Sequence, residues 1–321
     1  MISEEKPFRW SFSEAFKAYL RALACDCGLE NLLRQNLKKS GVAYKEIVSA
    51  DTKTTVLIAG PPEGQPLLLL HGTPGSALSW WNFLKRPGIY QIIAVDRPGF
   101  SPANRAIPDP VRDYSILSAI LKSVSQSQQA ILVGHSMGGG LAAKLAADHP
   151  EKVKALVLIG ASLDPGLEQI KPIQKVAKKA PLKLLINRSA RNSNEELIKY
   201  PEFLERLLPE LEKIKCPVLA VHARDDGLVP FKNVSFMERE FKGARIFNKL
   251  LFEHGGHDLH RYKDRETLNE IGKIFNPRIC FLSSRDTCGQ VHGIFPVTHP
   301  ANHASGQTRA TVQPACLLLP W

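Results

Sequence analysis

The sequence has 321 residues, of which 44% are hydrophobic and 23% charged, and these near-average fractions exclude a globally disordered chain, a collagen-like fibre and a disulfide-dense scaffold. The formal net charge is +11, but the basic residues are scattered and no RNA- or DNA-binding motif is present, so we predict no nucleic-acid partner. No apolar stretch approaches the roughly 20 residues that cross a bilayer, and the first residues lack the apolar run of a secretory signal.

The sequence contains six cysteines and no C-x-x-C pair. We therefore expect free thiols and a soluble cytoplasmic protein, because a reducing compartment keeps thiols unpaired. Without paired Cys and His at zinc-binding spacing we predict no metal ion, and we predict no cofactor. Stable membrane insertion is not expected, and the sequence does not indicate an oligomeric state.

Residues 1–41 are predicted to form an amino-terminal helical segment. Apolar side chains recur there every three to four residues, which is the spacing of one face of a helix. They are Phe8, Phe12, Phe16, Tyr19, Leu20 and Leu23, followed by Leu29, Leu32, Leu33 and Leu37. Such a face packs on its own domain or on a partner, or lies in a membrane interface, and packing is favoured over the membrane.

Residues 42–161 and 213–276 are predicted to form an α/β core. A strand pair at 42–48 and 54–59 is followed by short apolar runs bounded by Gly, Pro, Asp or His. These runs are 67–70, 92–95, 131–133, 156–159 and 218–221, and helical patterns lie at 78–84, 113–124, 137–148, 231–241 and 265–275. Continuous apolarity indicates strands buried on both faces. Alternation of such strands with helices predicts a doubly wound, mostly parallel sheet.

Two regions interrupt this alternation. Residues 162–212 are helical and charge-rich, and are predicted to form an insertion over one edge of the sheet. Its residues 171–194 carry lysines and arginines without an acid, and residues 195–212 carry six glutamates. Either the two parts form helices that attract each other, or the basic part forms a rim that draws anionic substrates. Residues 277–321 lack periodicity, hold five prolines and are predicted to be a poorly ordered tail.

A nucleophile is predicted at Ser136. It stands in the pentapeptide G-H-S-M-G, residues 134–138, directly after a predicted strand and directly before a predicted helix. A G-x-S-x-G turn in this context is so sharp that glycines are needed beside the serine, whose hydroxyl then stands at the carboxyl edge of the sheet. The amino terminus of the following helix points its unpaired N–H groups at the same place.

A serine hydroxyl is a weak nucleophile at neutral pH and needs a base within hydrogen-bond reach. In this strand–turn arrangement the order along the chain is serine, acid, histidine. His257, in a Gly-His pair after the last β-like run, is the favoured base, with His254 and His260 as rivals. The acid is expected in the Asp-rich turn upstream, where Asp226 is favoured and Asp225 is the alternative. This acid would hold the imidazole tautomer and stabilise the imidazolium.

Acyl transfer through a serine also needs donors for the oxyanion of the tetrahedral intermediate. The backbone N–H of Met137, directly after the nucleophile, is one predicted donor. The other is expected in the loop after the first buried strand, where Gly72 lets the backbone approach closely and the N–H of Thr73 is favoured. Pro74 has no N–H to give. His71, in the same loop, is expected to be a buried structural histidine.

Five motifs occur in order along the chain. They are H-G-T-P-G at 71–75, D-R-P-G-F-S at 96–101, G-H-S-M-G at 134–138, D-G-L-V-P at 226–230 and G-H at 256–257. With them, residues 42–276 resemble the α/β-hydrolase fold superfamily, in its serine-nucleophile, esterase- or lipase-like branch. Serine at the turn argues against the dehalogenase and epoxide-hydrolase branches, which need aspartate there. Ala223 and Ser101 depart from the pattern, since each stands where glycine is usual.

The resemblance implies a catalytic triad of Ser136, Asp226 and His257. It implies that the predicted insertion is a helical lid over the nucleophile. It also implies that Asp96 and Arg97 build a turn beside the oxyanion loop and do not act on substrate.

We predict a serine hydrolase of carboxylic esters or related acyl compounds, which takes a small-molecule acyl substrate through an acyl-enzyme intermediate. An acyltransferase, a C–C bond hydrolase and a cofactor-free perhydrolase are alternatives on the same triad. A non-catalytic small-molecule receptor is a further one. Trp80 and Trp81 fit the wall of a substrate pocket or the core equally well. The sequence does not indicate the acyl chain length.

Overall fold

The computed structural model describes residues 11, 13, 16–17, 20, 29–49, 52–101, 104, 107–108, 110–168, 170, 174 and 186–275. Three predicted features lie wholly or largely outside the described residues: the first apolar face of the amino-terminal segment, the basic part of the insertion, and the tail 277–321. They stay predictions, as do the domain boundaries drawn from the sequence.

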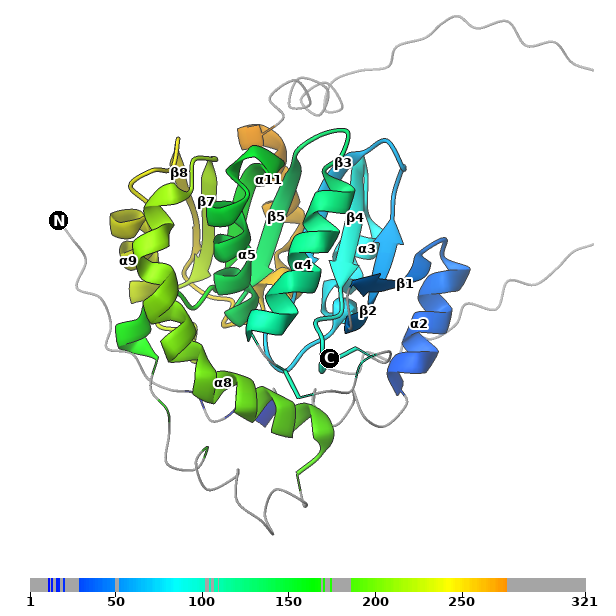
Figure 1. Ribbon diagram of the computed structural model, residues 1–321, viewed down its shortest axis with the longest axis horizontal. Coiled ribbons are helices and arrows are strands. Elements are labelled where there is room, and N and C mark those ends of the chain that lie inside the picture. Colours follow the sequence, from blue (N-terminus) through cyan, green and yellow to red (C-terminus); the bar gives the residue numbers. More distant parts are fainter. Residues whose placement is uncertain are drawn as a thin grey trace, which may run out of the picture.

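Among the described residues, eight strands form one sheet in the order β1-β2-β4-β3-β5-β6-β7-β8. They are β1 Ala43–Ser49, β2 Thr52–Ala59, β3 Gln65–Leu70, β4 Tyr90–Val95, β5 Ala130–His135, β6 Val153–Ile159, β7 Val218–Ala223 and β8 Phe247–Phe252. Strand β2 runs antiparallel to both of its neighbours, and every other pairing is parallel. The predicted doubly wound, mostly parallel sheet is confirmed (Figure 1).

Helices cover both faces of this sheet (Figure 1). The described helices and 3₁₀ turns are α2 Leu29–Lys39, η1 Ala77–Trp80, α3 Trp81–Lys85, α4 Pro110–Val124, α5 Met137–Asp148, η2 Pro150–Lys152, η3 Pro165–Leu167, α8 Arg188–Leu207, η4 Leu208–Lys213, α9 Lys232–Glu240, α10 Leu259–Tyr262 and α11 Asp264–Phe275. Leu68 and Leu70 of β3 pack in one apolar cluster with α4, α5 and α9. Leu67 and Leu69 pack in a second cluster with η1, α3 and α11. Successive side chains of a strand point to opposite faces, so a central strand of this sheet must be apolar at every position.

Helix α2 packs on the core through part of its apolar face. Leu37 is buried in the cluster of α3 and α11, whereas Leu32 is 55% exposed. Arg34 is also buried, and its guanidinium donates to the carboxylate of Asp96 at 2.9 Å. This described part of the amino-terminal segment is therefore domain packing. No helix within the described ranges is both long and apolar enough to cross a bilayer.

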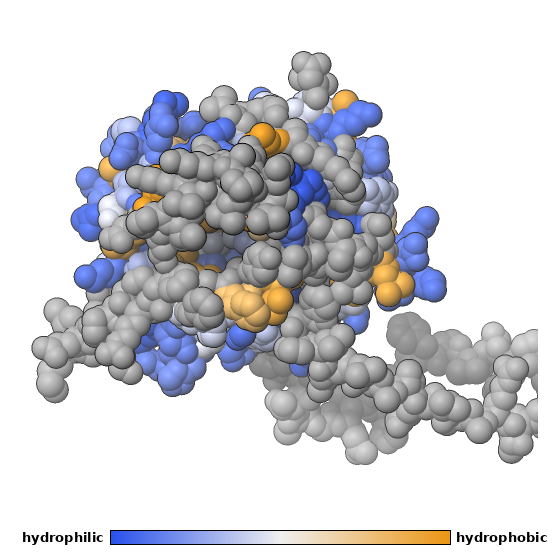
Figure 2. Space-filling view, turned by 90° about the horizontal axis from the view of Figure 1, so that it is seen from below, coloured by the Kyte–Doolittle hydropathy of each residue, from blue (hydrophilic) through white to orange (hydrophobic). Residues whose placement is uncertain are grey.

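Helix α8 crosses the carboxyl ends of the parallel strands, below the sheet in Figure 1. The buried Tyr200 donates its hydroxyl proton to the carbonyl of Ser162 at 2.7 Å, and its Oη lies 3.2 Å from that of Met137. Asn192 donates to the carbonyl of Gly99 at 2.8 Å. The helix thus contacts the loops that follow β4, β5 and β6. Figure 2 shows the molecule from this side, where the coloured surface is mainly hydrophilic and apolar residues gather in small, separate patches.

Trp80 and Trp81 differ in burial. Trp80 is fully buried, and its ring centroid lies 5.3 Å from that of Phe83 and 5.2 Å from that of His260. Trp81 is half-buried and packs against the same cluster. Of the two roles that the sequence left open, core packing therefore describes Trp80.

Candidate active site

Ser136 lies at a strained turn between β5 and α5. Its φ of 53° makes it the one non-glycine residue with a positive φ in the described part of the chain. Gly134 and Gly138 permit the turn: a Cβ at Gly134 would lie 2.5 Å from the carbonyl oxygen of Gly138, and one at Gly138 would lie 2.4 Å from that of Leu70. The flanking residues are buried and Ser136 is half-buried. The turn therefore presents the hydroxyl at the carboxyl edge of the sheet.

Asp226, in the loop after β7, is hydrogen-bonded to His257, in the loop after β8. Nδ1 of His257 lies 2.9 Å from Oδ2 of Asp226, and because an ionised carboxylate only accepts, Nδ1–H is the donor. Oδ1 of Asp226 accepts the N–H groups of Leu228 and Val229, at 2.9 Å each. Both members of the pair are buried. Nε2 is then the nitrogen of His257 that can accept a proton.

Two opposing effects set the pKa of Asp226. Burial is the largest and raises it, but the charge of His257, the hydrogen bond to it and the charge of His222 together hold the pKa below its usual value. Nε2 of His222 lies 3.5 Å from Oδ2 of Asp226. The carboxylate therefore stays ionised at neutral pH, which suits an acid that holds a neighbouring imidazole in one tautomer.

The other candidates from the sequence make other contacts. Asp225 is exposed, and its Oδ2 lies 3.3 Å from Nδ1 of the exposed His254. Its Oδ1 accepts the N–H of Gly256, and this hydrogen bond fixes the turn directly before His257. His260 is buried, with its ring centroid 3.8 Å from that of His135. The geometry therefore favours Asp226 over Asp225 as the partner of a catalytic imidazole.

Ser136 and His257 line the same cavity, whose volume of about 20 Å³ has room for roughly one water molecule. Its other described walls are Gly72, Thr73, Pro74, Ser79, His135, Leu228, Asp258, His260 and Arg261. A larger surface groove of about 870 Å³ lies at the amino ends of the strands, between Asp148 and Lys242. None of the predicted site residues lines that groove, so the small cavity is the candidate site.

Of the two predicted oxyanion donors, Thr73 lines this cavity and Met137 directly follows Ser136, which lines it. Met137 begins α5, and the first N–H groups of a helix have no acceptor within it. Thr73 lines the cavity directly. The carbonyl of Gly72 accepts from Nη2 of Arg97 at 2.9 Å and from Nδ1 of His71 at 2.7 Å. Because C=O and N–H point in opposite directions across a trans peptide, these two bonds turn the N–H of Thr73 to the other side of the loop.

A buried ion pair that the sequence did not indicate holds this loop. Nε and Nη2 of Arg97 donate to the carbonyls of His71 and Gly72, at 2.9 Å each. Nη1 and Nη2 also pair with the carboxylate of Glu196 in α8, which is buried as well. The sequence placed Glu196 in an acidic run. It stands four residues before the buried Tyr200 on α8, and this spacing, which puts both on one helix face, could have indicated that Glu196 is buried. Arg97 thereby ties α8 to the proposed oxyanion loop.

A second carboxylate lies near the Asp226 pair. Ser162, after β6, donates its N–H to the carbonyl of Ser136 at 3.3 Å and its hydroxyl to Glu168. Burial raises the pKa of Glu168, and the hydrogen bond from Ser162 and the charge of His257 oppose that rise. Glu168 is therefore a residue of the predicted insertion within electrostatic reach of the imidazole, and the sequence did not single it out.

Part of the chain, residues 65–181, matches a family model described as alpha/beta hydrolase fold. Among curated proteins, the chain is similar to the 2-hydroxymuconate semialdehyde hydrolase of Pseudomonas sp. (strain CF600), with 36% identity over 124 residues, 37% of this chain and 43% of the relative. It is 27% identical over 211 residues to the 2-hydroxy-6-oxo-6-phenylhexa-2,4-dienoate hydrolase of Comamonas testosteroni, 52% of this chain and 73% of that relative. The first match thus spans less than half of the relative's length.

Solved structures give the same fold. Cfl2 from Burkholderia cenocepacia superimposes with a TM-score of 0.60 at 19% identity, over 73% of this chain and 95% of that one. At this identity the likeness describes the arrangement of the chain and not its chemistry.

Proposed function

The chain belongs to the α/β-hydrolase fold superfamily, and we propose on that premise that it is a serine hydrolase with the triad Ser136, His257 and Asp226. One observation supports this proposal most: His257, hydrogen-bonded to Asp226 at 2.9 Å, lines the same cavity as the serine of the strained strand–helix turn. The order along the chain is serine, acid, histidine, as this turn requires.

In the proposed reaction Oγ of Ser136 attacks the acyl carbon while Nε2 of His257 takes its proton. Asp226 holds the imidazole tautomer through Nδ1 and stabilises the imidazolium. The N–H groups of Thr73 and Met137 are the proposed donors to the oxyanion. His257 then gives the proton to the leaving group, and water attacks the resulting acyl-enzyme by the same steps.

The proposed substrate is a small carboxylic ester or related acyl compound. The cavity beside Ser136, about 20 Å³, accepts one water-sized group, which favours a short acyl chain in this conformation of the described residues. Rates on p-nitrophenyl esters should therefore fall from acetate to butyrate to octanoate. A rate that rises with chain length would contradict this part of the proposal.

The same esters test the nucleophile. Ser136→Ala should lower kcat by on the order of 10⁴–10⁶, as triad deletions do elsewhere. His254→Gln is the matched control, because this exposed histidine pairs with Asp225 and not with Asp226. Near-full turnover by Ser136→Ala would refute the proposal, and a folded wild-type protein that turns over no acyl substrate would favour the receptor alternative.

The names of the curated relatives favour a second candidate on the same triad, which is hydrolysis of a C–C bond beside a ketone or aldehyde carbonyl. Attack of Ser136 on the ketone carbon gives the same kind of oxyanion, and the leaving group is a stabilised carbanion that takes a proton from a general acid. A 2-hydroxy-6-oxo-dienoate tests it: a kcat/KM well above that for every ester would assign this substrate class. Added alcohol or hydrogen peroxide, with product analysis, separates acyl transfer and perhydrolysis from hydrolysis.

A further inference from the structure

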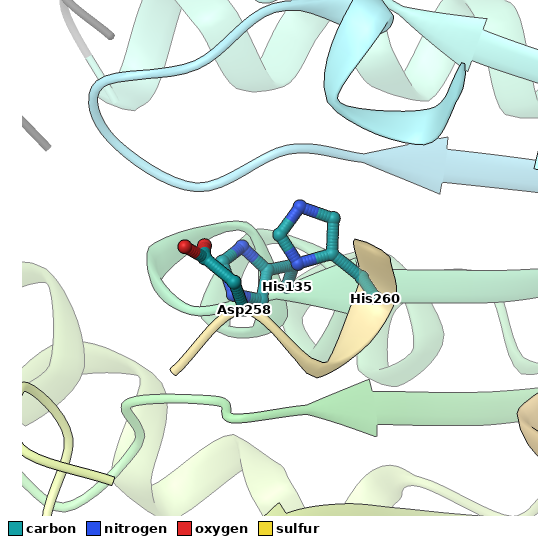
Figure 3. Close-up of side chains that lie close together, drawn as sticks. All are labelled: His135, Asp258 and His260. Carbon is teal, nitrogen blue, oxygen red and sulfur yellow. The ribbon is translucent and has the colours of Figure 1, made fainter. Parts of the chain in front are cut away.

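Three side chains of metal-binding type meet at the wall of the same cavity. They are His135 at the end of β5, Asp258 directly after His257, and His260 in α10 (Figure 3). One ligand atom from each lies within 4.8 Å of those of the other two. The two histidines are buried and Asp258 is half-buried, and all three line the cavity beside Ser136. The fold thus brings the imidazole of His135 to a carboxylate and an imidazole that stand two residues apart at the start of α10.

The backbone sets the tautomer of His135. Its Nε2 lies 3.0 Å from the carbonyl oxygen of His257, and because a carbonyl only accepts, Nε2 carries the proton. Nδ1 then carries the lone pair, and a hydrogen bond from the opposite nitrogen is what orients a metal-binding imidazole in proteins. Nδ1 lies beside Gly72, where an added Cβ would come within 3.1 Å of it, and both residues line the cavity.

The surroundings of the cluster are compatible with a cation. The ring of His260 is held between that of Trp80, at 5.2 Å between centroids, and that of His135, at 3.8 Å. The positive neighbour Arg261 also lines the cavity, but its Nη2 is directed at Oγ of Ser79, 3.5 Å away. Asp258 supplies a negative charge at the cluster, which offsets that repulsion.

We propose that His135, Asp258 and His260 form a binding site for a divalent transition-metal ion of the zinc type. Two imidazoles and one carboxylate suit zinc-like ions, whereas Mg²⁺ and Ca²⁺ take oxygen ligands. Bonds from zinc to nitrogen or oxygen measure about 2.0–2.2 Å, so binding draws the three ligand atoms closer together. A bound ion would join the turn that carries Ser136 to the loop that carries His257. This site goes beyond the hydrolase proposal and beyond the sequence, which predicted no metal.

Calorimetric titration of the full chain with Zn²⁺ tests the site. Asp258→Asn and His260→Gln each remove one ligand with little change in volume, and His254→Gln removes an exposed histidine nearby as the matched control. Wild type and the control should each bind one more Zn²⁺ per chain than Asp258→Asn and His260→Gln do, or should bind Zn²⁺ at least about tenfold more tightly. Further Cys and His residues stand in positions 277–321, so the difference between proteins is the quantity that decides. Equal stoichiometry and affinity in all four proteins would overturn the proposal.

Trp80 gives a second readout because its ring contacts that of His260. Co²⁺ should quench part of the tryptophan fluorescence of wild type and of the control, and Mg²⁺ should not. Zn²⁺ should also raise the Tm of wild type, because an ion that binds the folded state stabilises it. Quenching and a Tm rise that persist in Asp258→Asn would overturn the site. Asp258 is only half-buried, so Asp258→Asn should fold and can carry the test alone if His260→Gln does not fold. None of these measurements depends on hydrolysis.

Discussion

The buried pair of Arg97 and Glu196 predicts a variant that loses both stability and catalysis. The two side chains are 0% and 2% exposed, so solvent does not screen their interaction. The small contribution to stability that exposed ion pairs make therefore does not describe this pair. Glu196→Gln keeps the shape of the side chain but leaves the Arg97 guanidinium as an uncompensated buried charge. We expect the free energy of unfolding to fall by about 3–5 kcal/mol.

The same variant should lower kcat. Without the carboxylate, Arg97 holds the Gly72 carbonyl less firmly, and the N–H of Thr73 loses its orientation. Removal of one oxyanion donor lowers kcat by on the order of 10²–10³-fold. In Glu196→Gln the donor is displaced and not removed, so its kcat should fall by no more than this. Urea denaturation measures the first effect and p-nitrophenyl acetate hydrolysis the second. Glu202→Gln, whose partner Arg206 is as exposed as itself, is the matched control and should cost less than about 1 kcal/mol.

A double variant, Arg97→Met with Glu196→Leu, separates the two effects. Replacement of a buried ion pair by apolar side chains of similar volume is often neutral for stability, so the free energy of unfolding should recover. The kcat should stay low, because no guanidinium orients the Gly72 carbonyl. Wild-type kcat in a stable double variant, or a loss below about 1 kcal/mol in Glu196→Gln, would refute the reasoning.

Three further predictions follow from buried groups. Asp226→Asn should lower kcat by about 10⁴, while Asp225→Asn stays near wild type in the ester assay; the reverse order would assign Asp225 as the acid. Burial raises the pKa of Asp226, but the charge of His257, the hydrogen bond to it and the charge of His222 together outweigh burial, so the folded value lies below the ordinary 3.8. The contribution of Asp226 to the free energy of unfolding should therefore be present above its ordinary pKa and vanish as the pH falls through its pKa in the folded state. A difference in the free energy of unfolding between wild type and Asp226→Asn that persists in stronger acid would contradict this. Burial also raises the pKa of the Cys216 thiol to about 12, so peptide mapping should find iodoacetamide on Cys216 only after unfolding.

The central strands were predictable because burial on both faces leaves a continuous apolar run. β3 and β5 show this, since each is buried at every residue. β8 is an edge strand in which exposed and half-buried residues alternate around Lys249, so its apolar signal is weak. The helix expected at 78–84 is a 3₁₀ turn followed by the short α3, a distinction that side-chain spacing does not carry.

The candidate site divides in the same way. The strained turn at Ser136 was predictable because five consecutive residues define it. Glu196 was not, because its partner Arg97 lies 99 positions away and an acidic run on a helix ordinarily faces solvent. In the cluster of His135, Asp258 and His260, the last two stand together at the start of α10, but His135 ends β5, so only the packed sheet brings it to them.

Peptide mass mapping after reaction with a fluorophosphonate tests the central claim most directly, because this reagent bonds to a serine only when a neighbouring base activates it. We predict one adduct on the peptide that contains Ser136, and a strongly slowed reaction in His257→Gln, where the hydroxyl remains but its base is gone. No adduct at Ser136 in the folded wild-type protein, or an equally fast reaction in His257→Gln, would contradict the account.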